Sequence, residues 1–322
     1  MTGRRVIVGV AVMGLATTSV AALLAELYGV ASMRSVVLFG AIPAGALLIV
    51  AASSRHPILA DIGIRIRIGA LGGVLGTIGY DLVRIPFAMA GMRVFSPIHS
   101  YGVLVAGSSH STGWTDALGW LYHLSNGITF GIIYAVVAAR RTRWLGVVWG
   151  LLLETAAVYG PFAGRYGLSG QTFAIVVAYG AHLAYGYPLG VVVEHYDSMA
   201  QWLRRSRFAV TTAIAVPAAL IILAFRPWVA DPALERALEL RDRSGVVTAV
   251  IVGDRFRPEW LLIRSGECVA FVNEQDRTFQ SSVVGAIGPG TTVTWCPAGG
   301  PKVHRIRLDD APFSGGFVFV RD

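Results

Sequence analysis

The segment W-L-Y-H-L-S-N-G-I-T-F-G-I-I-Y, residues 120–134, lies in an apolar run and decides how the membrane part of the chain is interpreted. It carries one histidine and two glycines at intervals of four: His123, Gly127 and Gly131. The same spacing returns later in the chain, in H-L-A-Y-G-Y-P-L-G: His182, Gly186 and Gly190. Residues four apart share one helix face, so each histidine heads a stripe of glycines. Such a stripe indicates either a close helix-packing seam or the wall of a buried site.

Composition predicts a membrane protein. Of the 322 residues, 54% are hydrophobic and only 14% charged, and the mean hydropathy is +0.60. Soluble globular proteins carry roughly 25% charged residues. The net charge of +8 belongs entirely to residues 1–244, because the eight basic and eight acidic side chains of residues 245–322 cancel. The excess arginines cluster between apolar runs, which favours membrane topology over nucleic-acid binding as their cause.

Seven apolar segments are long enough to cross a bilayer, which needs about 20 helical residues. They are residues 5–26, 34–53, 66–91, 116–139, 144–163, 171–193 and 208–226. We therefore predict a seven-helix transmembrane domain over residues 1–228. The first segment has a signal peptide as its alternative, because a basic start and an apolar core precede small residues near Ala21.

Arginine counts predict the orientation of these segments. Four loops on one side hold eleven arginines: Arg4, Arg5, Arg55, Arg65, Arg67, Arg140, Arg141, Arg143, Arg204, Arg205 and Arg207. The loops on the other side hold four: Arg34, Arg93, Arg165 and Arg226. Cytoplasmic loops carry the excess of positive charge, so the N-terminus is expected in the cytoplasm and the C-terminus outside, in a periplasmic or extracellular compartment.

The longest outside loop, residues 92–115, has a short apolar centre that indicates an interfacial or re-entrant piece. It holds His99 and His110, which are candidate metal ligands, although histidines in loops are usually not ligands. After the last apolar segment, residues 229–244 are expected to form a linker helix, because Asp231-Pro232 is a helix-start signal. This helix is expected to rest on the membrane or on the domain that follows.

From Gly245 onward the hydrophobic pattern alternates with a period of two, and short runs are separated by Gly, Pro, Asn and Asp. Residues 245–322 are therefore predicted to form a small all-β Greek-key sandwich. Two cysteines, Cys268 and Cys296, fall on its predicted strands. A domain this small gains from a cross-link, and an oxidising compartment permits one, so a disulfide is expected. The alternative is two separately buried thiols.

The pattern Phe256-x-Pro258 followed by Gly266-Glu267-x-Val269-x-Phe271-x-Asn273 resembles the first half of a cupredoxin, the plastocyanin and azurin family. The Gly288-Pro289-Gly290 turn and the closing strand at Gly316 are similar to its second half. This resemblance implies a cupredoxin-like fold and one copper held by two histidines, a cysteine and a methionine. The corresponding positions here are Phe279, Leu308, Ala311 and Ser314, and His304 lies outside the pattern. No type-one copper is therefore expected.

Several ionisable or polar side chains fall inside the predicted membrane helices: Asp81, Arg84, His123, Asn126, Glu154 and His182. Such residues usually face other helices and carry function. Helix rise places His123 nearer the outer surface than His182, which favours pairing His123 with Asp81 and His182 with Glu154. Asp81 and Arg84 are also spaced for an ion pair.

Three chemistries fit this cluster: a transition-metal site formed by His123, His182, Asp81 and Glu154, a haem between the two histidines, or movement of protons or ions. The structural alternative is packing, with hydrogen-bonded histidines beside glycine seams such as Gly72-x-x-x-Gly76. The leading functional hypothesis is an accessory or electron-transfer-associated membrane component. Its rivals are a proton or metal-ion transporter or channel, and a structural anchor that displays a binding module.

Membrane lipids and an extracytoplasmic protein that binds the β-domain are the expected partners, and no nucleic acid is expected. No phosphate loop, G-x-S-x-G elbow or Cys–His pair indicates hydrolytic chemistry. Whether the chain is an enzyme is therefore left open.

Overall fold

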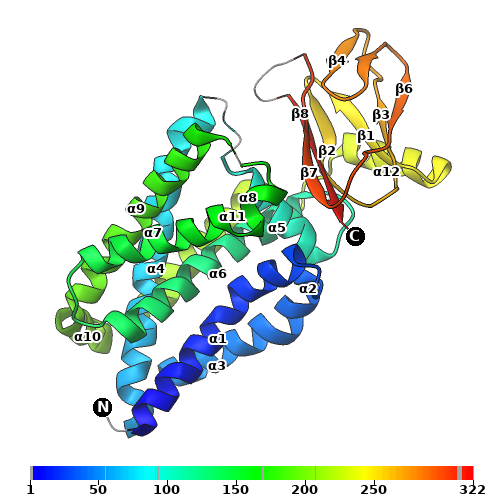
Figure 1. The fold of residues 1–322 in the computed structure, drawn as a ribbon. Coiled ribbons are helices and arrows are strands. Elements are labelled where there is room, and N and C mark those ends of the chain that lie inside the picture. The colour runs from blue at the N-terminus through cyan, green and yellow to red at the C-terminus, as the bar shows by residue number, and fades with distance from the viewer. Residues whose placement is uncertain are drawn as a thin grey trace. The chain divides into compact units, whose positions relative to one another are not determined.

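The computed structural model describes residues 3–54, 56–90, 92, 94–168, 170–206, 208–309 and 314–321 (Figure 1). These residues form two compact units. The helical unit comprises residues 1–86, 121–163 and 168–221. The second unit comprises residues 87–120, 164–167 and 222–322 and contains the β-domain. The ends of several long helices therefore belong to the second unit rather than to the helical one.

The helices follow the apolar segments of the sequence, with breaks that the hydropathy pattern does not mark. Their bounds are α1 Gly3–Leu27, α2 Met33–Val36, a π-helical turn Val37–Ala41, α3 Ile42–Ser53, α4 Pro57–Met89, α5 Ser96–Ala106, α6 Gly113–Ala138, α7 Trp144–Tyr159, α8 Pro161–Arg165, α9 Thr172–Glu194, α10 Tyr196–Arg205, α11 Ala209–Phe225 and α12 Pro232–Ser244. The α2 to α3 stretch forms one continuous span, Met33–Ser53.

Among the described residues, five helices rather than the expected seven are long and apolar enough to cross a membrane. They are Gly3–Leu27, Met33–Ser53, Leu59–Met89, Gly113–Ala138 and Thr172–Glu194. A sixth span is added if α10 and α11, which meet at a bend of 86°, are counted as one. The expected 144–163 helix divides at Gly160-Pro161, and its longer part, α7, has only 16 residues. The chain is thus a multi-pass membrane protein with fewer long spans than its hydropathy predicts.

Large apolar side chains cover the outside of these helices. Phe39 is 82% exposed, Ile7 69% and Val137 68%, and each lies on one of the five long spans. Soluble proteins rarely expose apolar surface this extensively, whereas a lipid-facing surface is made of such side chains. The exposure agrees with the membrane assignment.

Helix α4 is the centre of the helical unit. One buried cluster joins it to α6, α9 and α10 and includes Ile68, Ala135 and Leu189. A second cluster joins it to α1, α3 and α6 and includes Ile62 and Ile132. Both faces of α4 are therefore covered by other helices, and this position brings its polar residues into contact with the histidine-bearing helices.

The β-domain has eight strands among its described residues: β1 Val247–Val252, β2 Arg255–Arg264, β3 Val269–Val272, β4 Phe279–Ser281, β5 Gly285–Ile287, β6 Thr292–Trp295, β7 Lys302–Ile306 and β8 Gly315–Arg321. Six of them form one mixed sheet in the order β6-β3-β1-β2-β8-β7, and β4 pairs with β5. The expected Greek-key sandwich is thus a mixed sheet curled as a half-barrel (Figure 1).

Strand β2 produces the curl. Its residues 255–257 pair antiparallel with β1, whereas residues 260–264 pair in parallel with β8, which Arg255 also meets at Gly315. The register shifts between Arg255 and Trp260, so one strand serves two halves of the sheet. Alternation predicts strands but not which neighbour each half of a strand takes, so the sequence pattern could not show this arrangement.

Helix α12 confirms the expected linker helix. The side chain of Asp231 accepts hydrogen bonds from the backbone N–H groups of Ala233 and Leu234, both at 3.1 Å. Ala237 is fully buried with Val250 of β1 and Val272 of β3. The helix therefore packs on the β-domain, which is one of its two expected locations.

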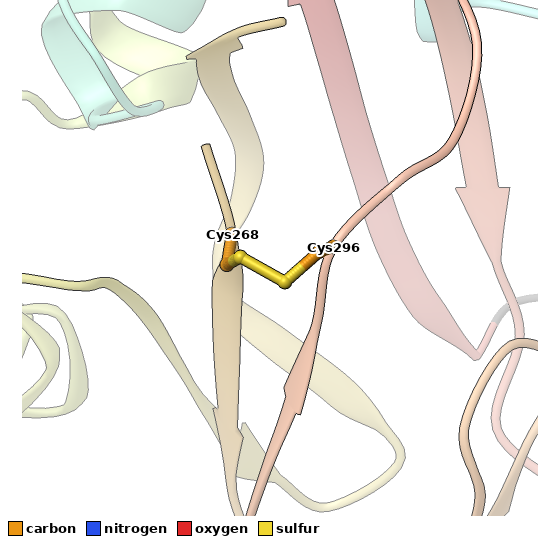
Figure 2. The surroundings of a disulfide bond; sticks show 2 residues. All are labelled: Cys268 and Cys296. Carbon is orange, nitrogen blue, oxygen red and sulfur yellow. A yellow bond between two sulfur atoms is a disulfide. The ribbon is translucent and has the colours of Figure 1, made fainter. Parts of the chain in front are cut away.

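The disulfide between Cys268 and Cys296 confirms the expected cross-link (Figure 2). Cys268 directly precedes β3 and Cys296 directly follows β6, and these strands pair antiparallel, with Val269 opposite Trp295. The bond therefore fastens one end of the edge strand β6 to the sheet. A disulfide of this kind is typical of an extracytoplasmic compartment.

The connection between α5 and α6 is bonded to β2 inside the second unit. The Ser111 N–H donates to the carbonyl of Trp260, and the Leu262 N–H donates to the carbonyl of Ser109, both at 2.8 Å. The predicted outer loop of the membrane domain thus adds a short bridge to the free edge of β2. His110, a candidate metal ligand, lies in this bridge opposite Leu261.

Candidate functional site

Two histidine–carboxylate pairs lie inside the helical unit. His123 Nε2 of α6 is 3.1 Å from Asp81 Oδ1 of α4, and His182 Nδ1 of α9 is 2.8 Å from Glu154 Oε2 of α7. The staggered pairing that helix rise predicts is therefore present. The side chain of Glu154 is only 6% exposed, and the other three are 17–20% exposed.

Tyr80 joins the two pairs. Its ring centroid lies 5.6 Å from that of His123 and 4.8 Å from that of His182, the latter edge to face. The guanidinium of Arg84 lies 4.9 Å from the centroid of the same ring. Three ionisable side chains therefore lie against the ring of one tyrosine, and the two histidines among them are each paired with a carboxylate. No sequence pattern marks Tyr80 as a site residue, because an aromatic residue in an apolar helix gives no signal that separates a site from ordinary packing.

The tautomer of His182 follows from its neighbours. Nδ1 lies 2.8 Å from the Glu154 carboxylate and 3.1 Å from the carbonyl oxygen of Ala178. A carbonyl only accepts hydrogen bonds, so Nδ1 carries the hydrogen and an oxygen of Glu154 accepts it. The ion pair expected between Asp81 and Arg84 stays a prediction, and the guanidinium of Arg84 lies over the ring of Tyr80.

A smaller polar network lies one helical turn further along α6. The hydroxyl of Ser19 on α1 donates to Asn126 Oδ1 at 2.6 Å and lies 3.2 Å from the Ser125 hydroxyl. Tyr122 donates to the carbonyl of Ser19 at 2.7 Å. These bonds attach α1 to α6 and satisfy Asn126, which the sequence singles out as a polar residue inside the membrane. Packing between the two helices is enough to explain these hydrogen bonds.

Glycine seams lie next to both histidines, toward the arginine-rich ends of the helices. On the α4–α6 contact, a Cβ at Gly73 would overlap the carbonyl oxygen of Gly127, and one at Gly131 would overlap that of Gly69. On the α7–α9 contact, a Cβ at Gly186 would overlap the carbonyl oxygen of Gly146.

Gly190 makes the same kind of contact with the backbone of Arg143. The packing role expected for Gly127, Gly131, Gly186 and Gly190 is therefore present. Backbones that touch leave no room for a water file between these helices.

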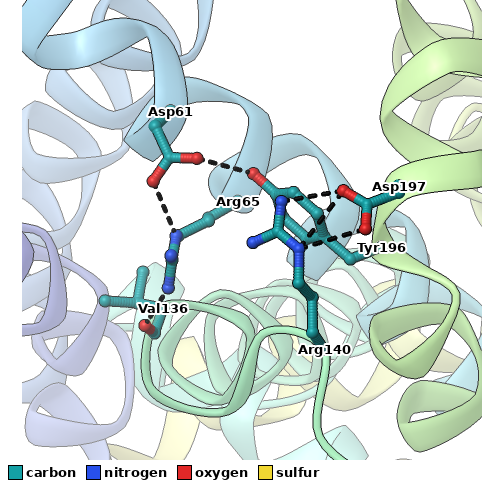
Figure 3. Close-up of polar contacts among 6 residues, drawn as sticks. All are labelled: Asp61, Arg65, Val136, Arg140, Tyr196 and Asp197. Atoms are coloured by element: carbon teal, nitrogen blue, oxygen red, sulfur yellow. Dashed lines mark hydrogen bonds and ion pairs between the residues drawn. The ribbon is translucent and has the colours of Figure 1, made fainter.

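The arginine-rich end of the helical unit holds a separate ionic network (Figure 3). Arg65 Nη1 donates to the carbonyl of Val136 at 2.8 Å, and Arg65 Nε bonds to Asp61, which also accepts a bond from Tyr196. Arg140 binds the carboxylate of Asp197 with three donor contacts of 2.8–3.2 Å. This network ties α4, α6 and α10 together at the end opposite Asp81 and Tyr80.

The metal hypothesis is not supported by this geometry. In the part of the chain that the structure describes, no three or more His, Cys, Asp or Glu side chains come together to hold a metal ion. His99 lies 2.9 Å from Asp116 within the second unit, which gives a two-residue pair rather than a metal site. Haem binding between His123 and His182 stays a prediction, with the ring of Tyr80 now found against both imidazoles.

The positions that correspond to the copper ligands lie in the core of the β-domain. Phe279 and Leu308 are fully buried in its main hydrophobic cluster. The hydroxyl of Ser314 accepts a hydrogen bond from the Leu308 N–H at 2.9 Å, and Ala311 lies outside the described residues. His304 is placed elsewhere, with its ring 5.1 Å from that of Trp295.

Fold and composition together define a multi-pass membrane protein with a C-terminal β-domain. Comparison of the chain with known protein families, curated proteins and solved structures finds no match. The likeness to cupredoxins is therefore carried by the quoted residues alone and stays a prediction.

Proposed function

We propose that this protein is a proton-responsive, accessory membrane component that exchanges protons with the outer compartment and does not conduct them across the bilayer. The observation that carries this proposal is the joining of two buried histidine–carboxylate pairs by Tyr80, at one end of the glycine seams. The β-domain, stapled by its disulfide, is the part that binds a partner protein.

Charge in a low-dielectric interior supports a protonation role. Groups of zero net charge are favoured there, because an isolated ion costs several kcal/mol to bury. The cluster brings two acidic side chains, Asp81 and Glu154, and one arginine, Arg84, together beside the two histidines. Adding or removing one proton at either histidine–carboxylate pair changes the net charge of the cluster by one. Protonation therefore acts directly on the packing of α4, α6, α7 and α9.

The seams favour an accessory protein over a transporter. A transported proton or ion needs a polar route on both sides of its binding site. On the arginine-rich side of both pairs, glycine backbones are in contact along α4–α6 and α7–α9. Proton exchange is therefore expected from the other side, which the arginine distribution predicts to be the outside.

Infrared spectroscopy of the full-length protein in lipid nanodiscs tests the proton-binding part of this proposal. The difference spectrum between pH 8 and pH 5 is expected to contain carboxyl bands that weaken in Asp81→Asn and in Glu154→Gln. The matched control is Glu239→Gln, which removes an exposed carboxylate of α12. Identical difference spectra for the two intramembrane variants and the control would refute the proposal.

The electron-transfer alternative requires a cofactor, and the same preparation tests it. A Soret band, or stoichiometric metal that is lost in the His123→Ala/His182→Ala double variant, would establish that alternative over the proton-responsive one. Our proposal predicts that neither is found.

A further inference from the structure

A shallow open pocket lies where α10 bends into α11 at the arginine-rich end of the helical unit. Its volume is about 690 Å³. Its lining comes from three helices: Leu71 of α4, Trp202 and Arg205 of α10, and Phe208, Ala209 and Thr212 at the start of α11. The lining combines one cation, Arg205, with mostly apolar side chains, and a phospholipid likewise combines a charged headgroup with apolar chains.

Two further arginines, Arg67 and Arg204, lie outside the pocket lining and add to its positive charge. Arg67 lies one helical turn before Leu71 on the same face of α4. Its Nε is buried and has no hydrogen-bond partner among the described residues. Arg204 is close enough to repel it electrostatically. Arg67, Arg204 and Arg205 have no ion pair with a carboxylate in the described part of the chain.

This arrangement differs from that of the neighbouring arginines. Arg65, Arg140 and Arg143 each bind a carboxylate of the protein. A buried donor without a partner is costly, and mutually repelling guanidinium groups add to the cost. An anion between Arg67, Arg204 and Arg205 would remove both penalties, because guanidinium groups bind phosphate with short, charge-assisted bonds.

The apolar side of the pocket suits an acyl chain. None of the residues of α11 is buried, and Phe208 is 77% exposed. Helix α10 is amphipathic: Tyr196, Ala200 and Leu203 are buried on one face, whereas Arg204 and Arg205 end the helix on the other. A helix of this kind lies in the interfacial plane of a membrane, with arginine at headgroup depth.

We propose that this pocket binds the phosphate of an anionic phospholipid, with Arg67, Arg204 and Arg205 around the headgroup and an acyl chain along α11. Zwitterionic lipid carries the same phosphate but adds a cationic group that the three arginines repel. The site therefore selects anionic over zwitterionic lipid. Each arginine near such a surface contributes a factor of about five in affinity.

Native mass spectrometry of the full-length protein tests the site, with phosphatidylglycerol and phosphatidylcholine of the same acyl chains as probes. The wild type is expected to retain phosphatidylglycerol in preference. Arg205→Gln, at the pocket surface, is expected to lower its affinity about five-fold, and Arg67→Gln by a similar factor. The matched control, Arg141→Gln, changes an exposed arginine of the same end that does not line the pocket.

Three outcomes would overturn the proposal. The first is equal retention of the two lipids by the wild type. The second is an equal loss in Arg141→Gln and Arg205→Gln, which would indicate only general surface charge. The third is displacement of the lipid by millimolar inorganic phosphate, which would show that free phosphate is the ligand. Because Arg67→Gln can disturb folding, the conclusion depends on Arg205→Gln, whose thermal unfolding is measured beside it.

Discussion

Helices α4, α6, α7 and α9 differ sharply between their two halves. In one half, ionisable side chains meet around Tyr80; in the other, glycines bring the backbones into contact. The polar half pairs each of the two histidines with a carboxylate, whereas in the glycine half the backbones of α4 and α6, and those of α7 and α9, are in contact. In the proposed function, these backbone contacts close the site on one side.

The largest expected effect comes from filling a glycine seam. Gly186→Val places a branched side chain against the backbone of Gly146, so we expect a loss of more than about 4 kcal/mol in stability, or no folded protein. Gly180→Val is the matched control on the same helix, because a Cβ there meets nothing within 4 Å. Thermal unfolding in detergent measures both. Equal stability of the two variants would contradict the close contact between α7 and α9.

Removing the disulfide tests the β-domain. Cys268→Ala/Cys296→Ala releases a loop with a sequence separation of 28 residues, which is expected to cost about 3 kcal/mol. Denaturant unfolding followed through β-domain signals measures the change. Treatment of the wild type with a reductant should reproduce it, and a reductant that destabilises the double variant equally would show that the bond is not the cause.

Weakening one intramembrane pair is expected to have a smaller effect than either change above. Glu154→Gln keeps a hydrogen-bond acceptor for His182 but removes the charge, so we expect a loss of about 2 kcal/mol. Asp197→Asn is the comparison, because its exposed pair with Arg140 should contribute less than about 1 kcal/mol. Thermal unfolding of both variants measures the difference. An equal loss of stability in Asp197→Asn would contradict the larger contribution predicted for the buried pair.

The smallest predicted effect is a pH dependence at the bridge between the α5–α6 connection and β2. Burial, and secondarily the charge of Arg241, lowers the pKa of His110. The folded state therefore holds fewer protons than the unfolded state, and the bridge is fully stable only above the unfolded pKa of about 6.5. As the pH falls below that value, the protection factor of the Leu262 amide, which corrects for the intrinsic pH dependence of exchange, should decrease. His110→Gln should remove this pH dependence and leave the exchange of distant strands unchanged.

Segment topology and helix rise were enough to pair the histidines with their carboxylates. The i, i+4 patterns at His123 and His182, together with helix rise, gave the correct carboxylate partner for each histidine. The disulfide and the start of α12 at Asp231 were likewise predictable, because they depend on local chemistry and domain size. These features are set by positions close in sequence or by one helix face.

Features that depend on distant packing could not be predicted. Tyr80 is part of the site only because α4 lies between α6 and α9. The half-barrel depends on β2 changing partners along its length, which alternation does not show. The span expected at residues 144–163 is not one helix, because hydropathy averages over Gly160-Pro161, where the chain breaks the helix. In each case the deciding contact lies outside the window that a local pattern samples.

Proton flux in proteoliposomes tests the central claim most directly. With a pH-sensitive dye inside the vesicles, an imposed pH gradient and valinomycin to balance charge, the account predicts a proton flux equal to that of protein-free vesicles. The glycine seams close the site on one side, so protons bound at His123 and His182 should leave by the route they entered. A flux above this background, lost in the His123→Ala/His182→Ala double variant, would contradict the account and establish a proton transporter.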